Sequence, residues 1–127
     1  MARVLIVDDT EVDLILEQAI LARFGHQTFM AKDGQQALKI CQEHDIEVVV
    51  TDLHMPAVHG FELITILRDL SPRPSIIAVS GTGSVQLELA HELGAQFTLH
   101  KPVMPERLIE AVKQVLAGRS KVADKLA

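Results

Sequence analysis

The sequence of 127 residues predicts one α/β domain, built as a parallel five-stranded sheet with helices on both faces. Five segments with strand character alternate with five segments of helical character, and the connections are so short that successive elements must be neighbours. Hydrophobic residues make up 48% of the chain and charged residues 23%, a balance that favours a globular domain over a disordered chain. Because domains average about 100–200 residues, we expect one domain.

The strands are predicted from short runs of β-branched and aliphatic residues. Three runs, at residues 4–7, 46–50 and 76–79, contain almost no polar residues, which is typical of strands buried on both faces of a parallel sheet. Two weaker runs, at residues 28–31 and 96–99, mix polar and apolar side chains. We expect these two runs to be the outer strands of the same sheet.

The helices are predicted from apolar stripes with i, i+3, i+4 spacing, which we expect to face the sheet. In chain order the stripes are Val12, Ile15, Leu16, Ala19 and Ile20; Ala37, Leu38 and Cys41; Leu63, Ile64, Leu67 and Leu70; Val85, Leu89 and Leu93; and Leu108, Val112, Val115 and Leu116. Asp33 is expected to cap the second helix, and Gly25 and Gly94 to end the first and fourth. Pro72 and Pro74 end the third helix, and Pro105 opens the fifth.

Charge, apolar runs and cysteine content narrow the functional classes. A formal net charge of -5 disfavours a free-standing nucleic-acid binder, which needs an electropositive face. No apolar run approaches the roughly 18 residues of a membrane span, and one cysteine, Cys41, fits a reducing compartment. We therefore expect a cytoplasmic domain at residues 1–117. Residues 118–127, beyond the last apolar stripe, are expected to form a C-terminal tail or the start of a linker.

Reactive side chains follow four of the five predicted strands, at the edge where an open parallel sheet places its functional crevice. These residues are Asp8 and Asp9, Asp52, Ser80 and Gly81, and Lys101 and Pro102. Each alone has an ordinary explanation, such as Asp9 capping the first helix, but three carboxylates together repel one another. At 4 Å and an effective dielectric of 20, each like-charged pair costs about 4 kcal/mol. Lys101 offsets one charge, and a divalent ion would cancel the remaining two.

The chemistry of the donors indicates which ion and which reaction. The site offers only hard oxygen ligands, which favour Mg²⁺ or Mn²⁺. Mg²⁺ often bridges to phosphate, so phosphoryl transfer is the natural candidate. One carboxylate would be the nucleophile, Lys101 would pair with a phosphoryl oxygen, and Ser80 would donate a hydrogen bond.

Taken together, the residues Asp8-Asp9, the segment from Asp52 to Gly60, Ser80-Gly81 and Lys101-Pro102 resemble the receiver domain of bacterial two-component response regulators. The resemblance covers about residues 2–117. It implies a flavodoxin-like (βα)5 doubly wound sandwich with strand order 2-1-3-4-5, similar to single-domain chemotaxis-type receivers. It also implies a cis bond between Lys101 and Pro102.

The resemblance assigns a role to each of these positions. It implies that Asp52 is the phosphoryl acceptor and that Asp8 and Asp9 hold Mg²⁺ with an Asp52 oxygen and the His54 carbonyl. The amides of Leu53 and Gly81 would face the phosphoryl oxygens. Lys101 would bind the phosphoryl group, and Ser80 would be the switch hydroxyl.

This sequence departs from the family pattern at several positions. Thr98 stands where the family usually has a switch aromatic, and Phe97 lies one position earlier. His59 stands where an Asp commonly precedes the glycine. His54 and Thr82 occupy positions that would flank an attacking water. We therefore expect loop and helix shifts, rather than the usual aromatic relay, to carry the signal.

The favoured interpretation is a phosphorylation switch, not a metabolic enzyme, that catalyses only its own phosphorylation and dephosphorylation. The donor would be a sensor histidine kinase or a histidine phosphotransfer protein. The output partner, a downstream protein or an attached domain, would meet the face formed by the fourth helix, fifth strand and fifth helix, and phosphorylation could also drive dimerisation. No direct nucleic-acid or membrane contact is expected.

Four other classes of protein are alternatives to this interpretation. The main alternative is a degenerate receiver that acts as a phosphate-independent docking surface, although all five site positions are intact. A small Mg²⁺-dependent aspartyl-phosphate phosphohydrolase would need Asp-x-Asp after the first strand, where this chain has Asp8 and Thr10. A flavin-binding electron carrier would have its cofactor phosphate repelled by Asp8 and Asp9. A histidine phosphotransfer protein is all-helical, which the strands contradict.

Overall fold

The computed structural model describes residues 2–54, 60–81 and 83–126. Strands and helices alternate: β1 (Arg3–Val7), α1 (Glu11–Arg23), β2 (Gln27–Ala31), α2 (Gly34–Glu43), β3 (Val48–Asp52), α3 (Gly60–Leu67), β4 (Ser75–Ser80), α4 (Ser84–Leu93), β5 (Phe97–His100) and α5 (Pro105–Leu126). Every strand pair is parallel, and the sheet order is β2-β1-β3-β4-β5. The predicted fold class and strand order are confirmed, with the two weak runs at the sheet edges.

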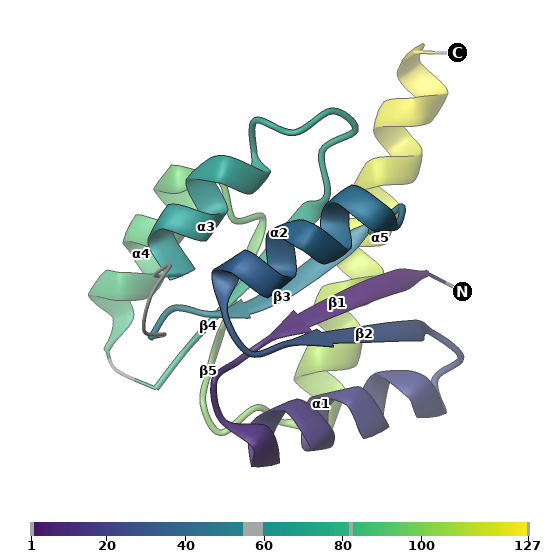
Figure 1. Cartoon of the computed structure of the whole chain (residues 1–127). Coiled ribbons are helices and arrows are strands. Elements are labelled where there is room, and N and C mark those ends of the chain that lie inside the picture. Colours follow the sequence, from purple (N-terminus) through teal and green to yellow (C-terminus); the bar gives the residue numbers. More distant parts are fainter. Residues whose placement is uncertain (1, 55–59, 82, 127) are drawn as a thin grey trace.

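The sheet is covered on both faces, so most residues of its central strands are apolar (Figure 1). Alternate residues of one strand enter different cores: Leu5 and Val7 pack toward α2, α3 and α4, whereas Val4 and Ile6 pack toward α1 and α5. This arrangement explains why the sequence shows continuous apolar runs rather than alternation. Among the described residues, no helix combines the length and apolar character that a membrane crossing needs.

The predicted ends of α1 and α4 and the predicted starts of α2 and α5 agree with the structure, whereas α3 ends at Leu67, before Leu70 and Pro72. Asp33 caps α2 by accepting a hydrogen bond from the Gln36 amide at 2.8 Å. Gly25, just after α1, has φ +86°, a conformation that favours glycine, and Gly94 ends α4 at φ +138°. Pro105 is the first residue of α5.

For α1 and α4, the predictions of which side of the helix faces the sheet are wrong. In α1, the buried residues are Leu14, Glu17 and Leu21, whereas Val12 and Ile15 are 73% and 57% exposed. Spacing alone could not decide this, because α1 carries apolar residues around most of its circumference. The register of α1 is instead fixed by Leu14 and Leu21, which pack into the core that α1 shares with α5.

The same error affects α4. Its buried residues are Leu87 and Ala90, and Leu93 is partly buried against the same core. Val85 and Leu89, which the stripe placed against the sheet, are 71% and 44% exposed. The stripes predicted for α2, α3 and α5 do contact the cores.

Helix α5 continues past the predicted domain boundary. It runs without interruption for 22 residues, and its C-terminal part projects beyond the sheet (Figure 1). Near the boundary, Arg119 donates to the Arg73 carbonyl at 2.8 Å and to Ser75 Oγ at 3.3 Å, which ties α5 to the start of β4. The boundary at residue 117 itself stays a prediction.

Candidate functional site

Three of the predicted site residues come from the carboxyl ends of three neighbouring strands. Asp8 directly follows β1, as predicted. The sequence predicts Asp52 and Ser80 just after their strands, but they are the last residues of β3 and β4. All three are buried, at 1%, 5% and 0% exposure. Asp9 is exposed at the mouth of the site. The parallel sheet therefore gathers side chains that are far apart in sequence.

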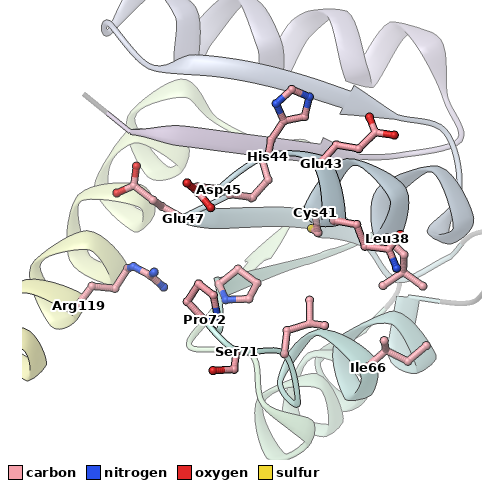
Figure 2. Close-up of a pocket in the computed structure, with 14 residues that line it drawn as sticks. Leu38, Cys41, Glu43, His44, Asp45, Glu47, Ile66, Ser71, Pro72 and Arg119 are labelled. Atoms are coloured by element: carbon pink, nitrogen blue, oxygen red, sulfur yellow. The ribbon is translucent and has the colours of Figure 1, made fainter.

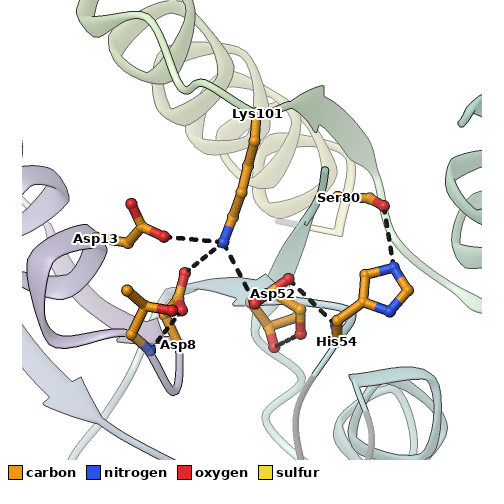
Figure 3. A network of polar contacts seen from close by, with 8 residues as sticks. Asp8, Asp13, Asp52, His54, Ser80 and Lys101 are labelled. Carbon is orange, nitrogen blue, oxygen red and sulfur yellow. Dashed lines mark hydrogen bonds and ion pairs between the residues drawn. The ribbon is translucent and has the colours of Figure 1, made fainter. Parts of the chain in front are cut away.

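Lys101 joins these elements through its ammonium group (Figure 3). Its Nζ donates to Asp8 Oδ2 at 3.0 Å and to Asp52 Oδ2 at 3.3 Å. A third acceptor, Asp13 Oδ2 on the first turn of α1, also lies at 3.0 Å. The Lys101–Pro102 peptide bond is cis, as the resemblance implied.

The charges of the site act on one another through these contacts. Burial alone lowers the pKa of Lys101, but its hydrogen bonds to Asp13 and Asp8 and the nearby carboxylate charges raise that pKa above its ordinary value. Burial raises the pKa of Asp8, against the lowering effects of the Thr10 amide and Lys101. The ammonium is therefore firmly charged and holds the carboxylates together.

A hard divalent cation fits the donor set. Asp8, Asp9 and Asp52 each offer an oxygen, and the three oxygens lie within 4.8 Å of one another. Oxygens on opposite sides of a bound Mg²⁺ are about 4.2 Å apart, because each Mg–O distance is about 2.1 Å. The upper limit of 4.8 Å is only slightly wider than this distance, so these residues are compatible with Mg²⁺. Asp9 does not cap α1, since the residue at the N-cap is Thr10.

Backbone groups beside Asp52 are arranged differently from the expectation. The Leu53 amide, expected to face a phosphoryl group, donates to the Val79 carbonyl at 3.0 Å. The amide that points at the Asp52 carboxylate is that of His54, whose N lies 3.2 Å from Oδ1. The imidazole of His54 reaches across to β4, with Nε2 3.5 Å from Ser80 Oγ (Figure 3). His54 thus contacts both the expected acceptor, Asp52, and the expected switch hydroxyl of Ser80.

Of the other positions named from the sequence, the structure describes Gly81 and Thr98. Gly81 is exposed beside Lys101, and a Cβ there would meet the Lys101 side-chain carbons at an ordinary 3.8 Å. Thr98 is half-buried in β5. His59 and Thr82 lie outside the described residues.

Sequence reasoning missed three residues around the site. No motif points to Asp13, although its place on the first turn after Asp8 and Asp9 is a usable signal. Glu17 was missed because a carboxyl on the buried face of a helix breaks the apolar pattern. Gly60 was quoted only as part of a motif, yet a Cβ there would come within 2.5 Å of Leu53 Cα. No side chain at position 60 fits this close approach.

Two cavities lie near opposite ends of the strands. A cavity of about 370 Å³ lies beside the site, lined by Asp13, Leu16, Glu17, Gly81, Lys101, Pro102 and Val103. A cavity of about 530 Å³ lies between the C-terminal part of α2 and the α3–β4 connection (Figure 2). None of the predicted site residues lines that larger cavity, so it is separate from the acidic cluster.

Comparisons with known proteins agree with this geometry. The family model described as "Response regulator receiver domain" matches residues 4–113. The chain is 32% identical to Protein PilH of Pseudomonas aeruginosa, over 93% of this chain and 100% of PilH. It is 33% identical to the autoinducer 1 sensor kinase/phosphatase LuxN of Vibrio harveyi over 91% of this chain, which spans only 13% of LuxN. The solved structure of the chemotaxis response regulator CheY4 of Vibrio cholerae superposes with a TM-score of 0.83 at 30% identity, covering 91% of this chain and 98% of CheY4.

Proposed function

The chain belongs to the receiver-domain family of response regulators, and from this membership we propose that it is a Mg²⁺-dependent phosphorylation switch with Asp52 as its phosphoryl acceptor. Receiver domains bind Mg²⁺ through an acidic pocket and are generally not enzymes in their own right. One observation carries the proposal: the Lys101 ammonium lies against Asp52 at the edge of the sheet where Asp8 and Asp9 also offer oxygens.

The proposed donor is a phosphohistidine on a partner protein, a sensor histidine kinase or a histidine phosphotransfer protein. An Asp52 carboxylate oxygen attacks the phosphorus, a P–O bond forms, and the P–N bond to the donor imidazole breaks. The imidazole leaves with the bonding electron pair and takes a proton from solvent. The receiver contributes the nucleophile and the electrostatic environment, which is the main requirement of phosphoryl transfer.

Positive charge around Asp52 stabilises the transferring group in this mechanism. Lys101 already donates to Asp52 Oδ2 and can pass this hydrogen bond to a phosphoryl oxygen. The His54 amide, 3.2 Å from Oδ1, is placed to donate to the same region. Mg²⁺ held by Asp8, Asp9, Asp52 and the His54 carbonyl would supply further neutralisation of the phosphoryl oxygens.

The switch would act through Ser80 and the segments that follow β3 and β4. A phosphoryl oxygen on Asp52 would offer the buried Ser80 hydroxyl a charged acceptor, and Ser80 Oγ would then leave its contact with His54 Nε2, which is 3.5 Å away. Losing the His54–Ser80 contact would loosen one of the links between the residues after β3 and the end of β4. Because position 98 is a threonine, we assign the signal to these loops and to α4.

The output face that we propose comprises α4, β5 and α5. Val85 and Leu89 are apolar and exposed on α4, so a partner could bury them. On the other side of the site, α1 exposes Val12, Ile15 and Leu16, and this apolar stripe is suited to docking the phosphodonor. We infer a cytoplasmic location from the kinase partner that this chemistry requires.

The test is the intact mass of the protein after incubation with Mg²⁺ and acetyl phosphate. Wild type should gain one phosphoryl group that hydroxylamine removes, and Asp52→Asn should gain none. Asp45→Asn is the matched control, because Asp45 is highly exposed on another edge of the molecule and should behave as wild type. If wild type forms no adduct with acetyl phosphate, beryllofluoride or a panel of histidine kinases, the switch is refuted and a phosphate-independent docking receiver takes its place.

A further inference from the structure

Lys101 has a partner that the proposed switch does not use. Its Nζ lies 3.0 Å from Asp13 Oδ2, shorter than the 3.3 Å to Asp52 Oδ2. Asp13 lies on α1, 88 positions away in sequence, and its side chain is 34% exposed, against 2% for Asp8. The ammonium is thus held from the α1 side as well as from the acceptor side (Figure 3).

The number of N–H groups on Lys101 limits what else it can bind. An ammonium has three donors, and the contacts to Asp8, Asp13 and Asp52 use one each. A phosphoryl oxygen can therefore bind Lys101 only by replacing one of these acceptors. The Asp52 contact is the longest and the one that phosphorylation would replace. Asp13 would then continue to bind the ammonium from the α1 side and compete with the phosphoryl oxygen for its position.

Asp13 also changes the charge of the site. Asp8, Asp9 and Asp52 with Lys101 carry a formal charge of about -2, and Asp13 makes it about -3. The additional negative charge attracts a divalent cation and repels an anionic phosphodonor. One carboxylate thus acts in opposite directions on the two ligands of the site.

We propose that Asp13 is a positioning residue that binds the Lys101 ammonium from α1, in competition with Asp52 and its phosphoryl group. Its negative charge strengthens Mg²⁺ binding and lowers the rate at which Asp52 is phosphorylated. This inference rests on the proposed function of Asp52. The cavity of about 370 Å³ that Asp13 and Lys101 line leaves room for the ammonium to shift when its partners change. Among the described residues, the hydrogen bond and ion pair of Asp13 are to Lys101 and not to Asp52, so we expect Asp13 to act through Lys101 and through its charge.

The decisive variant is Asp13→Asn, which keeps the shape of the side chain and removes its charge. Glu11→Gln is the matched control, because Glu11 is an exposed carboxylate on the same first turn of α1. Two quantities are measured for each protein: the Mg²⁺ dissociation constant by calorimetry, and the rate of phosphorylation by acetyl phosphate at saturating Mg²⁺ from intact mass. Circular dichroism establishes that each variant is folded.

For Asp13→Asn, the Mg²⁺ dissociation constant and the phosphorylation rate should both rise about threefold to tenfold, the size expected for one partly solvated charge nearby. Glu11→Gln should change each by less than about twofold, since its charge is screened by solvent. Structural damage to the site would weaken Mg²⁺ binding and lower the rate together, so a fall in rate would overturn the proposal. Values within twofold of the control would also overturn it.

The two measurements separate failure of this inference from failure of the switch. If wild type accepts no phosphoryl group, the proposed function fails, and calorimetry alone then decides the role of Asp13. An unchanged Mg²⁺ dissociation constant in Asp13→Asn would refute the inference in that case. If wild type is phosphorylated at Asp52 and Asp13→Asn reacts no faster than wild type, only the role of Asp13 is refuted.

Discussion

Replacing the buried Glu17 with glutamine should stabilise the protein, and by an amount that depends on pH. Glu17 lies on the buried face of α1 between Leu14 and Leu21 and is 3% exposed. Burial, followed by the negative charge of Asp8, raises its pKa from 4.5 to about 8. The Lys101 charge acts in the opposite sense but does not prevent this shift.

The size of the effect follows from the two pKa values. Between pH 4.5 and pH 8 the native state keeps the Glu17 proton while the unfolded chain releases it, so the unfolded state binds fewer protons and native stability falls as pH rises. Each pKa unit is worth about 1.36 kcal/mol. The loss is therefore about 3 kcal/mol by pH 7 and approaches about 5 kcal/mol above pH 8. Glutamine does not ionise and avoids this loss.

The assay is urea unfolding of wild type and Glu17→Gln, followed by circular dichroism because the chain has no Trp or Tyr. Measurements at several pH values between about 5 and 9 should include EDTA, because a bound cation would alter the field of Asp8, Asp13 and Asp52. The stability advantage of Glu17→Gln should grow by about 1.4 kcal/mol per pH unit up to pH 7.5 and then level off. Exposed Glu11→Gln should show no such trend.

A constant difference between Glu17→Gln and wild type across this range would refute the reasoning. It would show that Glu17 has the same pKa in the native and unfolded states, and that its carboxylate is solvated despite its burial. A variant that is less stable at every pH would show that the native state requires the carboxyl group itself.

Three further predictions test other features. In urea titrations, Leu14→Ala should lower the free energy of unfolding by about 2–5 kcal/mol, and Val12→Ala by less than about 0.5 kcal/mol. Equal losses would contradict the observation that α1 buries Leu14 and exposes Val12. Gly60→Ala should lower the free energy of unfolding by at least about 1 kcal/mol and slow phosphorylation, because its Cβ would lie 2.5 Å from Leu53 Cα. A variant as stable as wild type would disprove this close approach. Mg²⁺ should raise the melting temperature of wild type, and Asp9→Asn should abolish most of that rise; an undiminished rise would remove Asp9 from the cation site.

The order of elements and the sheet could be predicted because burial on both faces leaves a direct pattern in the sequence. Val4 and Leu5 are adjacent and both fully buried, each in the hydrophobic core on a different face of the sheet. A central strand therefore appears in the sequence as an apolar run. Helix phase could not be predicted in the same way. In α1 and α4, apolar residues occupy both the buried and the exposed face, and the packing of a few side chains selects between them.

The family resemblance predicts the strand order that the structure has. The carboxyl ends of parallel strands meet at one edge of a sheet, and this rule alone groups Asp8, Asp52, Ser80 and Lys101. The contact between Asp13 and Lys101 could not be predicted in this way, because it joins residues 88 positions apart and depends on how α1 is rotated against the sheet. The same rotation buries Glu17. Rotation about a helix axis is set by the summed packing of distant side chains, and local spacing does not specify it.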